Sequence, residues 1–109
     1  TASVDDRYGV ADGYMPIAER HQLILDGLTE CIRVLKVGGR LLVKVQDQVA
    51  SGRVWWQTDM VTRAAEEQGC RKVDALLFLG GRRQPVGRRQ IHARRNYSTL
   101  FVFAKEASA

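Results

Sequence analysis

The apolar positions of the chain follow a helical period in two segments. Within residues 17–36, apolar side chains recur three or four positions apart, at Leu25, Leu28, Ile32 and Leu35. That spacing places side chains on one face of an α-helix. Residues 54–68 have a similar pattern, and Gly69 follows them where a helix commonly ends in the left-handed conformation. We therefore predict two helices, over residues 17–36 and 54–68.

Three further segments have the pattern of β-strands. Residues 40–46 carry a nearly continuous apolar run, which is typical of a strand covered on both faces in a parallel α/β sheet. Residues 98–105 alternate between two sides, as a half-buried strand does, and residues 72–79 also favour a strand. Gly38 and Gly39 turn the chain between the first helix and the first strand. The expected order is helix, strand, helix, strand, strand.

Two segments show no such period. Residues 1–16 are irregular, and residues 80–96 separate the last two predicted strands. Connections longer than about 12 to 15 residues are uncommon in compact domains and are usually functional or disordered. We predict one domain over residues 17–105, preceded by the irregular segment and followed by a tail over residues 106–109.

Basic residues concentrate in the connection over residues 80–96. The chain has a net charge of +5, but residues 82–95 contain six arginines and no acidic residue, so the rest of the chain sums to −1. A guanidinium group offers a fork of donors that matches phosphate oxygens, and such a cluster indicates an anionic partner such as DNA or RNA. A solvated charged face is the alternative. The candidate nucleic-acid-binding residues are Arg82, Arg83, Arg88, Arg89, Arg94 and Arg95.

Three segments of the chain resemble the C-terminal half of a class I S-adenosylmethionine-dependent methyltransferase. Residues 33–43 look like the family's helix–proline–glycine–glycine–strand junction, with Val37 where proline is usual. Residues 73–77 and 97–105 look like its final β-hairpin. The basic run over residues 88–97 makes the chain most similar to the DNA methylases that modify adenine N6 or cytosine N4.

This resemblance implies both a fold and a reaction. The fold would be α/β, a three-layer Rossmann-like methyltransferase C-terminal half with a final antiparallel β-hairpin. The chain would be part of an enzyme that transfers a methyl group to an exocyclic base nitrogen, for which the base must leave the duplex. S-adenosyl-L-methionine would be the cofactor of the full-length protein, which would include an N-terminal half that this chain lacks.

The family's two chemical motifs match no residues here. We find no glycine-rich cofactor turn between a strand and a helix, and the two prolines, Pro16 and Pro85, are too far apart for an Asp/Asn-Pro-Pro-Tyr/Phe motif. We therefore assign no catalytic, cofactor-binding or metal-binding residue, and we expect the chain alone to be inactive and to bind the cofactor weakly. The alternatives are a non-catalytic nucleic-acid-binding module using the arginine-rich loop, or a methyltransferase fragment acting on RNA or a small molecule.

Polar residues follow the first predicted strand. Gln46, Asp47 and Gln48 lie at its carboxyl end, where open α/β sheets bind ligands, so they are substrate-cleft candidates. A loop that satisfies its own backbone is an equal alternative. Trp55 and Trp56 leave two interpretations open as well: one indole stacks on a base, or one is in the core and the other partly exposed.

The remaining residues suggest location and assembly. No apolar run approaches the roughly 20 residues of a membrane span, so we expect no membrane partner and a cytoplasmic protein. Cys31 and Cys70 are expected to be buried structural residues, and His21 to lie on a helix surface. A three-stranded sheet with an apolar edge and face invites pairing, so we also expect a homo-oligomer.

Overall fold

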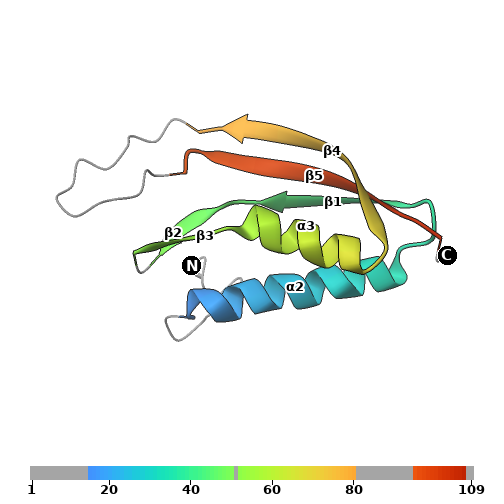
Figure 1. Cartoon of the computed structure of the whole chain (residues 1–109), viewed down its shortest axis with the longest axis horizontal. Coiled ribbons are helices and arrows are strands. Elements are labelled where there is room, and N and C mark those ends of the chain that lie inside the picture. Colours follow the sequence, from blue (N-terminus) through green and yellow to red (C-terminus); the bar gives the residue numbers. More distant parts are fainter. Residues whose placement is uncertain (1–14, 51, 81–94, 108–109) are drawn as a thin grey trace, which may run out of the picture.

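The computed structural model describes residues 15–50, 52–80 and 95–107. Its elements are α2 (Ile17–Val34), β1 (Arg40–Val45), β2 (Gln48–Ala50), β3 (Arg53–Trp55), α3 (Gln57–Glu67), β4 (Cys70–Leu79) and β5 (Tyr97–Lys105) (Figure 1). The predicted helix over residues 17–36 and the three predicted strands are confirmed to within a few residues. The second predicted helix is also present, but it begins at Gln57 because the residues before it form β3.

β5 is the central strand of a three-stranded sheet. The order is β1-β5-β4, and both pairs are antiparallel. Val45 of β1 lies opposite Thr99, and Leu79 of β4 lies opposite Tyr97, with an irregularity in the second ladder between Lys72 and Asp74. Because β1 and β4 are each antiparallel to β5, they run in the same direction and end at the same edge of the sheet.

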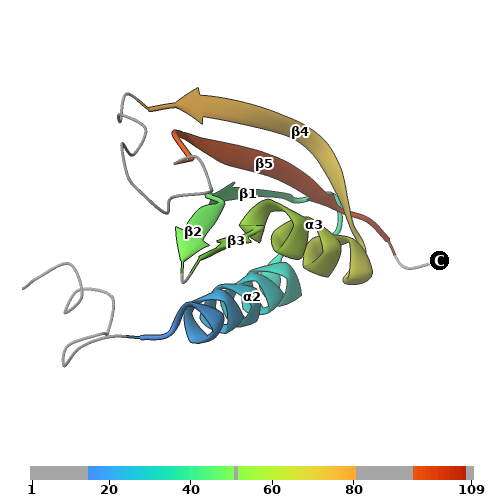
Figure 2. The same ribbon diagram turned by 60° about the vertical axis from the view of Figure 1, so that its left-hand side comes forward.

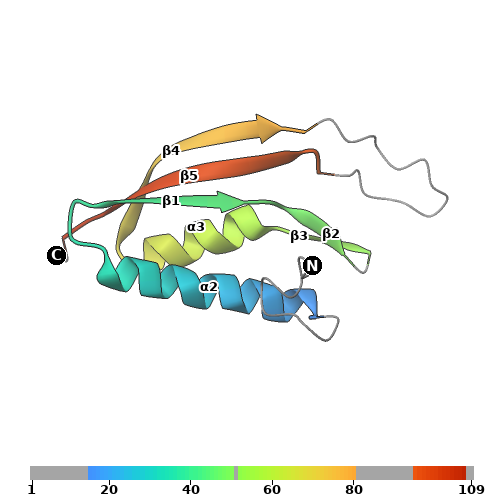
Figure 3. The same ribbon diagram turned by 180° about the vertical axis from the view of Figure 1, so that it is seen from behind.

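The two helices pack on one side of this sheet. All three views place α3 beside α2, on the side of α2 nearer the strands (Figures 1, 2 and 3). Burial of apolar side chains between the helices and the sheet is the main stabilising term of such an arrangement. The buried cluster consists of Leu28, Ile32, Val45, Val61, Ala65, Cys70, Phe101 and Phe103.

The expected three-layer Rossmann-like methyltransferase fold is therefore wrong. The described residues form two layers, with helices on one side of a sheet whose strand pairs are all antiparallel. The apolar run of β1 has a different cause from coverage on both faces: Leu41 and Val43 pack against the core, whereas Leu42 is 59% exposed. Antiparallel neighbours can follow one another directly, whereas parallel neighbours need a crossover, and β5 follows β4 without a described helix between them.

Three local expectations also change. β2 and β3 pair as a short antiparallel hairpin, where no strand was expected and the predicted second helix already began at residue 54, with Gly52 at a φ of +76° beside the turn. His21 is buried rather than on the helix surface, at 3% exposure. Cys31 is exposed, whereas Cys70 is buried as predicted. Burial raises the pKa of the Cys70 thiol, which suits a structural residue.

A lysine joins the first helix to the last strand. The Lys105 Nζ donates hydrogen bonds of 2.7 Å to the carbonyl oxygens of Ile32 and Leu35, at the end of α2. The Lys105 backbone exchanges hydrogen bonds with Gly38 and Gly39. Gly38 has a φ of +85°, the left-handed conformation expected of the glycine turn. The predicted glycine junction is thus fastened to the end of β5.

The helices in the described ranges include none that combines the length and apolar character needed to cross a membrane.

Candidate nucleic-acid interface

Four chain segments meet at one edge of the sheet. β1 and β4 end there, β5 begins there, and the N-terminus of α3 follows the β2–β3 hairpin to the same place (Figure 1). The Gly80 N–H donates a hydrogen bond to the Asn96 carbonyl oxygen, so the residues that flank 81–94 are joined here. We call the polar residues at this edge the strand-end cluster, which comprises Gln46, Asp47, Gln57, Thr58 and Tyr97.

Asp47 is the centre of the strand-end cluster. It is 2% exposed, and its Oδ1 accepts hydrogen bonds of 3.0 Å from both the backbone N–H and the hydroxyl of Thr58. The first N–H groups of a helix have no partner within it, and the helix dipole favours a negative charge at that end. Asp47 therefore caps α3 from a separate segment of the chain.

Tyr97 completes the hydrogen bonding of Asp47. Its hydroxyl donates to Asp47 Oδ2 at 3.0 Å. Burial raises the pKa of the Tyr97 hydroxyl, and the hydrogen bond to Asp47 and the charge of that carboxylate raise it further, against an opposing effect of Arg95. The phenol is accordingly held protonated, as a donor to the carboxylate requires. This contact fixes the start of β5 to the loop after β1.

Gln46 connects the same edge to the basic segment. Its backbone N–H donates to Gln57 Oε1 at 2.9 Å, and its side-chain Nε2 donates to the Arg95 carbonyl oxygen at 3.4 Å. Gln57 is itself buried. The position of Arg95, one of the predicted nucleic-acid-binding arginines, is therefore set by the end of β1.

The Arg95 guanidinium lies over an exposed indole. Its Cζ is 5.3 Å from the centre of the Trp56 ring, and Trp56 is 48% exposed. The Arg95 Nε is buried without a hydrogen-bond partner among the described residues. Trp55, by contrast, is partly buried beneath Arg53 and against His21. A cation beside an exposed aromatic ring is the pairing that binds phosphate and stacks on a base in single-strand binding proteins.

The structure brings together some of the predicted site residues. Gln46, Asp47 and Arg95 meet at the strand-end edge, whereas Gln48 pairs with Trp55 in the β2–β3 hairpin and is outside the cluster. The other candidate arginines lie outside the described residues: Arg82, Arg83, Arg88, Arg89 and Arg94.

Sequence reasoning missed the partners of Asp47 and Gln46. Gln57 and Thr58 open α3, but the predicted helix began three residues too early, which placed them in its interior. Polar residues at the first turn of a helix signal a capping interaction, so a correct start would have singled them out.

Comparison with known proteins adds no assignment. No protein-family model and no curated protein matches this chain. A function is therefore inferred from the residues and their geometry.

Proposed function

We propose that this chain is the DNA-contacting part of an S-adenosylmethionine-dependent DNA methyltransferase that modifies an exocyclic base nitrogen. The resemblance of residues 33–43 and 97–105 to that family supports the reaction class. The strand-end edge supports the partner. In this proposal the cofactor binds an N-terminal half of the same cytoplasmic protein, and the chain alone binds nucleic acid without methylating it.

One observation carries the nucleic-acid part of the proposal: Arg95 lies over the exposed ring of Trp56, at the edge where Gly80 is hydrogen-bonded to Asn96. The guanidinium can contact a phosphate while the indole stacks on a base. Residues 82–94 contain five further arginines in the chain segment that precedes Arg95. Phosphate neutralisation by such arginines gives most of the affinity of a protein for DNA.

Asp47 has a positioning role in this proposal. Its oxygens are engaged by Thr58 and Tyr97, so it is a buried support and not a nucleic-acid contact. By fixing the start of α3 and the start of β5, it sets Trp56 and Arg95 next to each other. A buried support of this kind limits the freedom of contact residues and lowers the entropic cost of binding.

Binding of a labelled DNA duplex and a single strand of the same sequence, followed by fluorescence anisotropy over a salt series, tests the proposal. We expect affinity to fall steeply with salt. R95A should weaken binding about fivefold and reduce the salt slope by about one. R33A is the matched control, because Arg33 is an exposed arginine of α2 paired with Glu30 near the helix end remote from this edge.

Two results would contradict the proposal. Affinity that does not change with salt would exclude phosphate contacts, and equal effects of R95A and R33A would remove Arg95 from the interface. Calorimetric titration with S-adenosylmethionine tests the other part of the proposal: tight binding by this chain would show that no other half is needed to hold the cofactor.

The second candidate function is a non-catalytic nucleic-acid-binding module. The Arg95–Trp56 pair favours it, because stacking and phosphate contact need no cofactor and suit DNA and RNA alike. Comparing single-stranded DNA and RNA of equal length distinguishes the two candidates. Equal affinity favours the module, and a marked preference for DNA favours the methyltransferase.

A further inference from the structure

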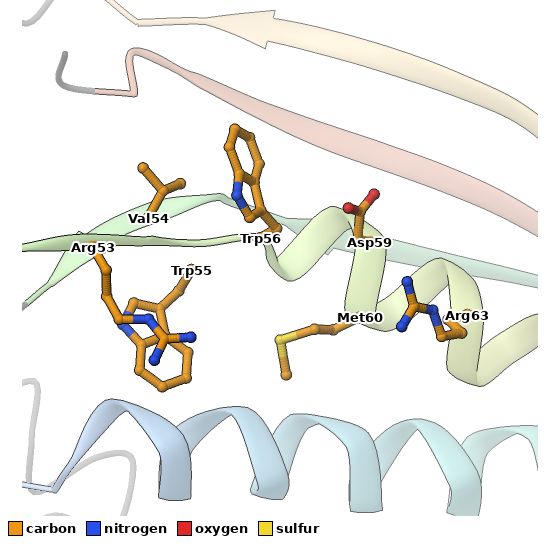
Figure 4. A pocket seen from close by; sticks show the side chains of 7 residues that line it. All are labelled: Arg53, Val54, Trp55, Trp56, Asp59, Met60 and Arg63. Carbon is orange, nitrogen blue, oxygen red and sulfur yellow. The ribbon is translucent and has the colours of Figure 1, made fainter. Parts of the chain in front are cut away.

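A shallow groove lies over the junction of β3 and α3. Its volume is about 360 Å³, and its lining includes Arg53, Trp55, Trp56, Asp59, Met60 and Arg63 (Figure 4). A volume of about 300 to 1,000 Å³ is the usual range of small-ligand sites. The groove is separate from the strand-end cluster, with which it shares none of its lining residues.

Aromatic surface and positive charge are combined in this groove. The two indoles leave the chain in opposite directions, Trp55 toward α2 and Trp56 away from it (Figure 4). The Arg53 Cζ lies 4.3 Å from the centre of the Trp55 ring. Arg95 lies over the Trp56 ring, and Trp56 is nearly half exposed. Each indole therefore already has a guanidinium beside it.

His21 of α2 packs against the Trp55 side of the groove. His21 is buried and meets the Trp55 ring edge-on, with 5.3 Å between centroids and 81° between planes. Its Nδ1 lies 3.1 Å from the Met60 sulfur. The Trp55 Nε1 is buried without a hydrogen-bond partner among the described residues. This packing fixes the Trp55 ring and, with it, the backbone from which the adjacent Trp56 extends, which lowers the entropic cost of binding a ligand.

The charged groups of the groove are available to a ligand. Arg53, Asp59 and Arg63 are exposed, and neither arginine forms an ion pair within the described part of the chain. A guanidinium group offers donors that match phosphate oxygens. The Asp59 carboxylate accepts hydrogen bonds, which a sugar hydroxyl or a base amino group can donate.

We infer that this groove binds one unpaired nucleotide. The base stacks on the exposed Trp56 indole, and Arg53 or Arg63, at the two ends of the groove, contacts the phosphate. The inference rests on the proposed function and adds to it the place where one unpaired nucleotide of the nucleic-acid strand binds. A nucleotide in a strand and a free nucleotide share this chemistry, so the test includes both.

Tryptophan fluorescence reports on this groove and on the Arg95–Trp56 pair at its edge. The chain has two tryptophans, and both line it. AMP, adenosine and a single-stranded oligo(dA) are titrated, with excitation at the red edge of indole absorption, where adenine does not absorb. We expect saturable quenching by AMP with a Kd of about 1 mM or tighter, weaker quenching by adenosine, and tighter binding of oligo(dA). Tighter binding of AMP than of oligo(dA) would identify a free nucleotide as the ligand.

Variants separate the two contacts. W56L should weaken AMP binding about tenfold by removing the stacking surface while keeping apolar bulk, and the remaining Trp55 still reports. The double variant R53A/R63A should weaken AMP about tenfold and leave adenosine unchanged. The matched control R33A/R71A removes two exposed arginines far from the groove and should change neither.

The outcomes distinguish this inference from the proposed function. Absence of saturable quenching by AMP and by oligo(dA), or unchanged AMP affinity in R53A/R63A, would overturn the nucleotide groove. If DNA binding then remains salt-dependent and sensitive to R95A, the proposed function stands without the groove. If AMP quenches as expected while DNA does not bind, the groove stands and the proposed function fails.

Discussion

Asp47 shows how one buried carboxylate can join two elements. It accepts hydrogen bonds from Thr58 and from Tyr97, which belong to α3 and β5. Replacing it with alanine leaves these donors buried without an acceptor. We expect D47A to lower the free energy of unfolding by about 3 kcal/mol in urea denaturation, and D47N, which keeps one oxygen acceptor, by less.

A double-mutant cycle with Y97F tests whether this energy comes from the stated contacts. The two substitutions remove the same hydrogen bond, so their combined effect should be smaller than the sum of the single effects. Additive effects would contradict a direct contact between Asp47 and Tyr97. T62A is the control for hydroxyl loss, because Thr62 lies in α3 but outside the strand-end cluster.

His21 makes the stability of the chain depend on pH. Burial lowers its pKa below the ordinary value of 6.5, the charge of Arg20 lowers it further, and Asp47 opposes both. Below pH 6.5 the unfolded chain therefore binds a proton more readily than the folded chain does. We expect the free energy of unfolding to fall as the pH drops from 6.5 toward the lowered pKa, and to be unaffected by this residue above 6.5.

Urea denaturation across a pH series measures this effect. H21F keeps an aromatic ring against Trp55 and Met60 but cannot be protonated, so it should remove the loss of stability in that window. A variant with the same acid dependence as the unsubstituted chain would show that other groups cause it.

At the scale of single residues, the sequence indicated the chemical character of a residue better than the neighbours that the fold gives it. Asp47 was recognisable as a polar residue after a strand, but its donors lie 11 and 50 positions away in the chain. His21 was expected on a helix surface, but it is buried. The pattern of its own helix does not reveal that Trp55 and Met60 cover it.

At the scale of elements, Lys105 connects the end of α2 to the end of β5. Its Nζ donates two hydrogen bonds to carbonyl groups at the end of the helix. A positive charge there also interacts favourably with the negative end of the helix dipole. We expect K105M to lower the free energy of unfolding by about 2 kcal/mol. Urea denaturation gives the value directly.

K36M is the matched control for this substitution. Lys36 is an exposed lysine in the turn after α2, close in sequence to the same helix end. Its replacement should change stability by less than about 0.5 kcal/mol, as surface substitutions usually do. Equal losses in K36M and K105M would mean that lost charge, and not the two hydrogen bonds, determines the effect.

Long elements were predictable and the short hairpin was not. The residues of α2 and β5 repeat their period several times, which makes the type of element evident. β2 and β3 each have three residues, too few to show an alternation. The hairpin nevertheless determines the groove, because it brings Arg53, Trp55 and Trp56 to the start of α3.

At the scale of the whole molecule, strand direction was the property that the sequence did not show. The apolar run of β1 fits a strand buried on both faces and equally a strand with one exposed apolar face. The described structure has the second arrangement. The sequence pattern does not show which face is exposed, because Leu42 is as apolar as Leu41 and Val43, which pack against the core.

The helix-free face of the sheet is continuous across all three strands. Leu42 lies opposite Val102, and Leu76 lies opposite Leu100, on the side away from the buried Phe101 and Phe103. The Lys44 Nζ lies 5.6 Å from the Phe78 ring, which places both on this same side. Exposed apolar surface on several adjacent strands is characteristic of a surface that contacts another protein.

We expect this face to pair with a second copy of the chain. It carries Lys44 and Asp74 among its apolar residues, so two copies related by a two-fold axis can place opposite charges against each other as they bury the apolar side chains. Sedimentation equilibrium over a range of concentrations should show a reversible dimer. L42K/L76K should shift the equilibrium to monomer without loss of folding, because both side chains are exposed in the single chain.

L23K is the matched control for charge on an exposed leucine, since Leu23 lies on α2 and not on the sheet. It should leave the dimer intact. A monomer at every concentration would contradict the pairing of copies, and dissociation by L23K would move the contact to the helical side. Because the helix-free face and the groove have no residue in common, the dimerisation variants should leave AMP quenching unchanged. Loss of both properties together would instead indicate that L42K/L76K disturbs the fold on which each of them depends.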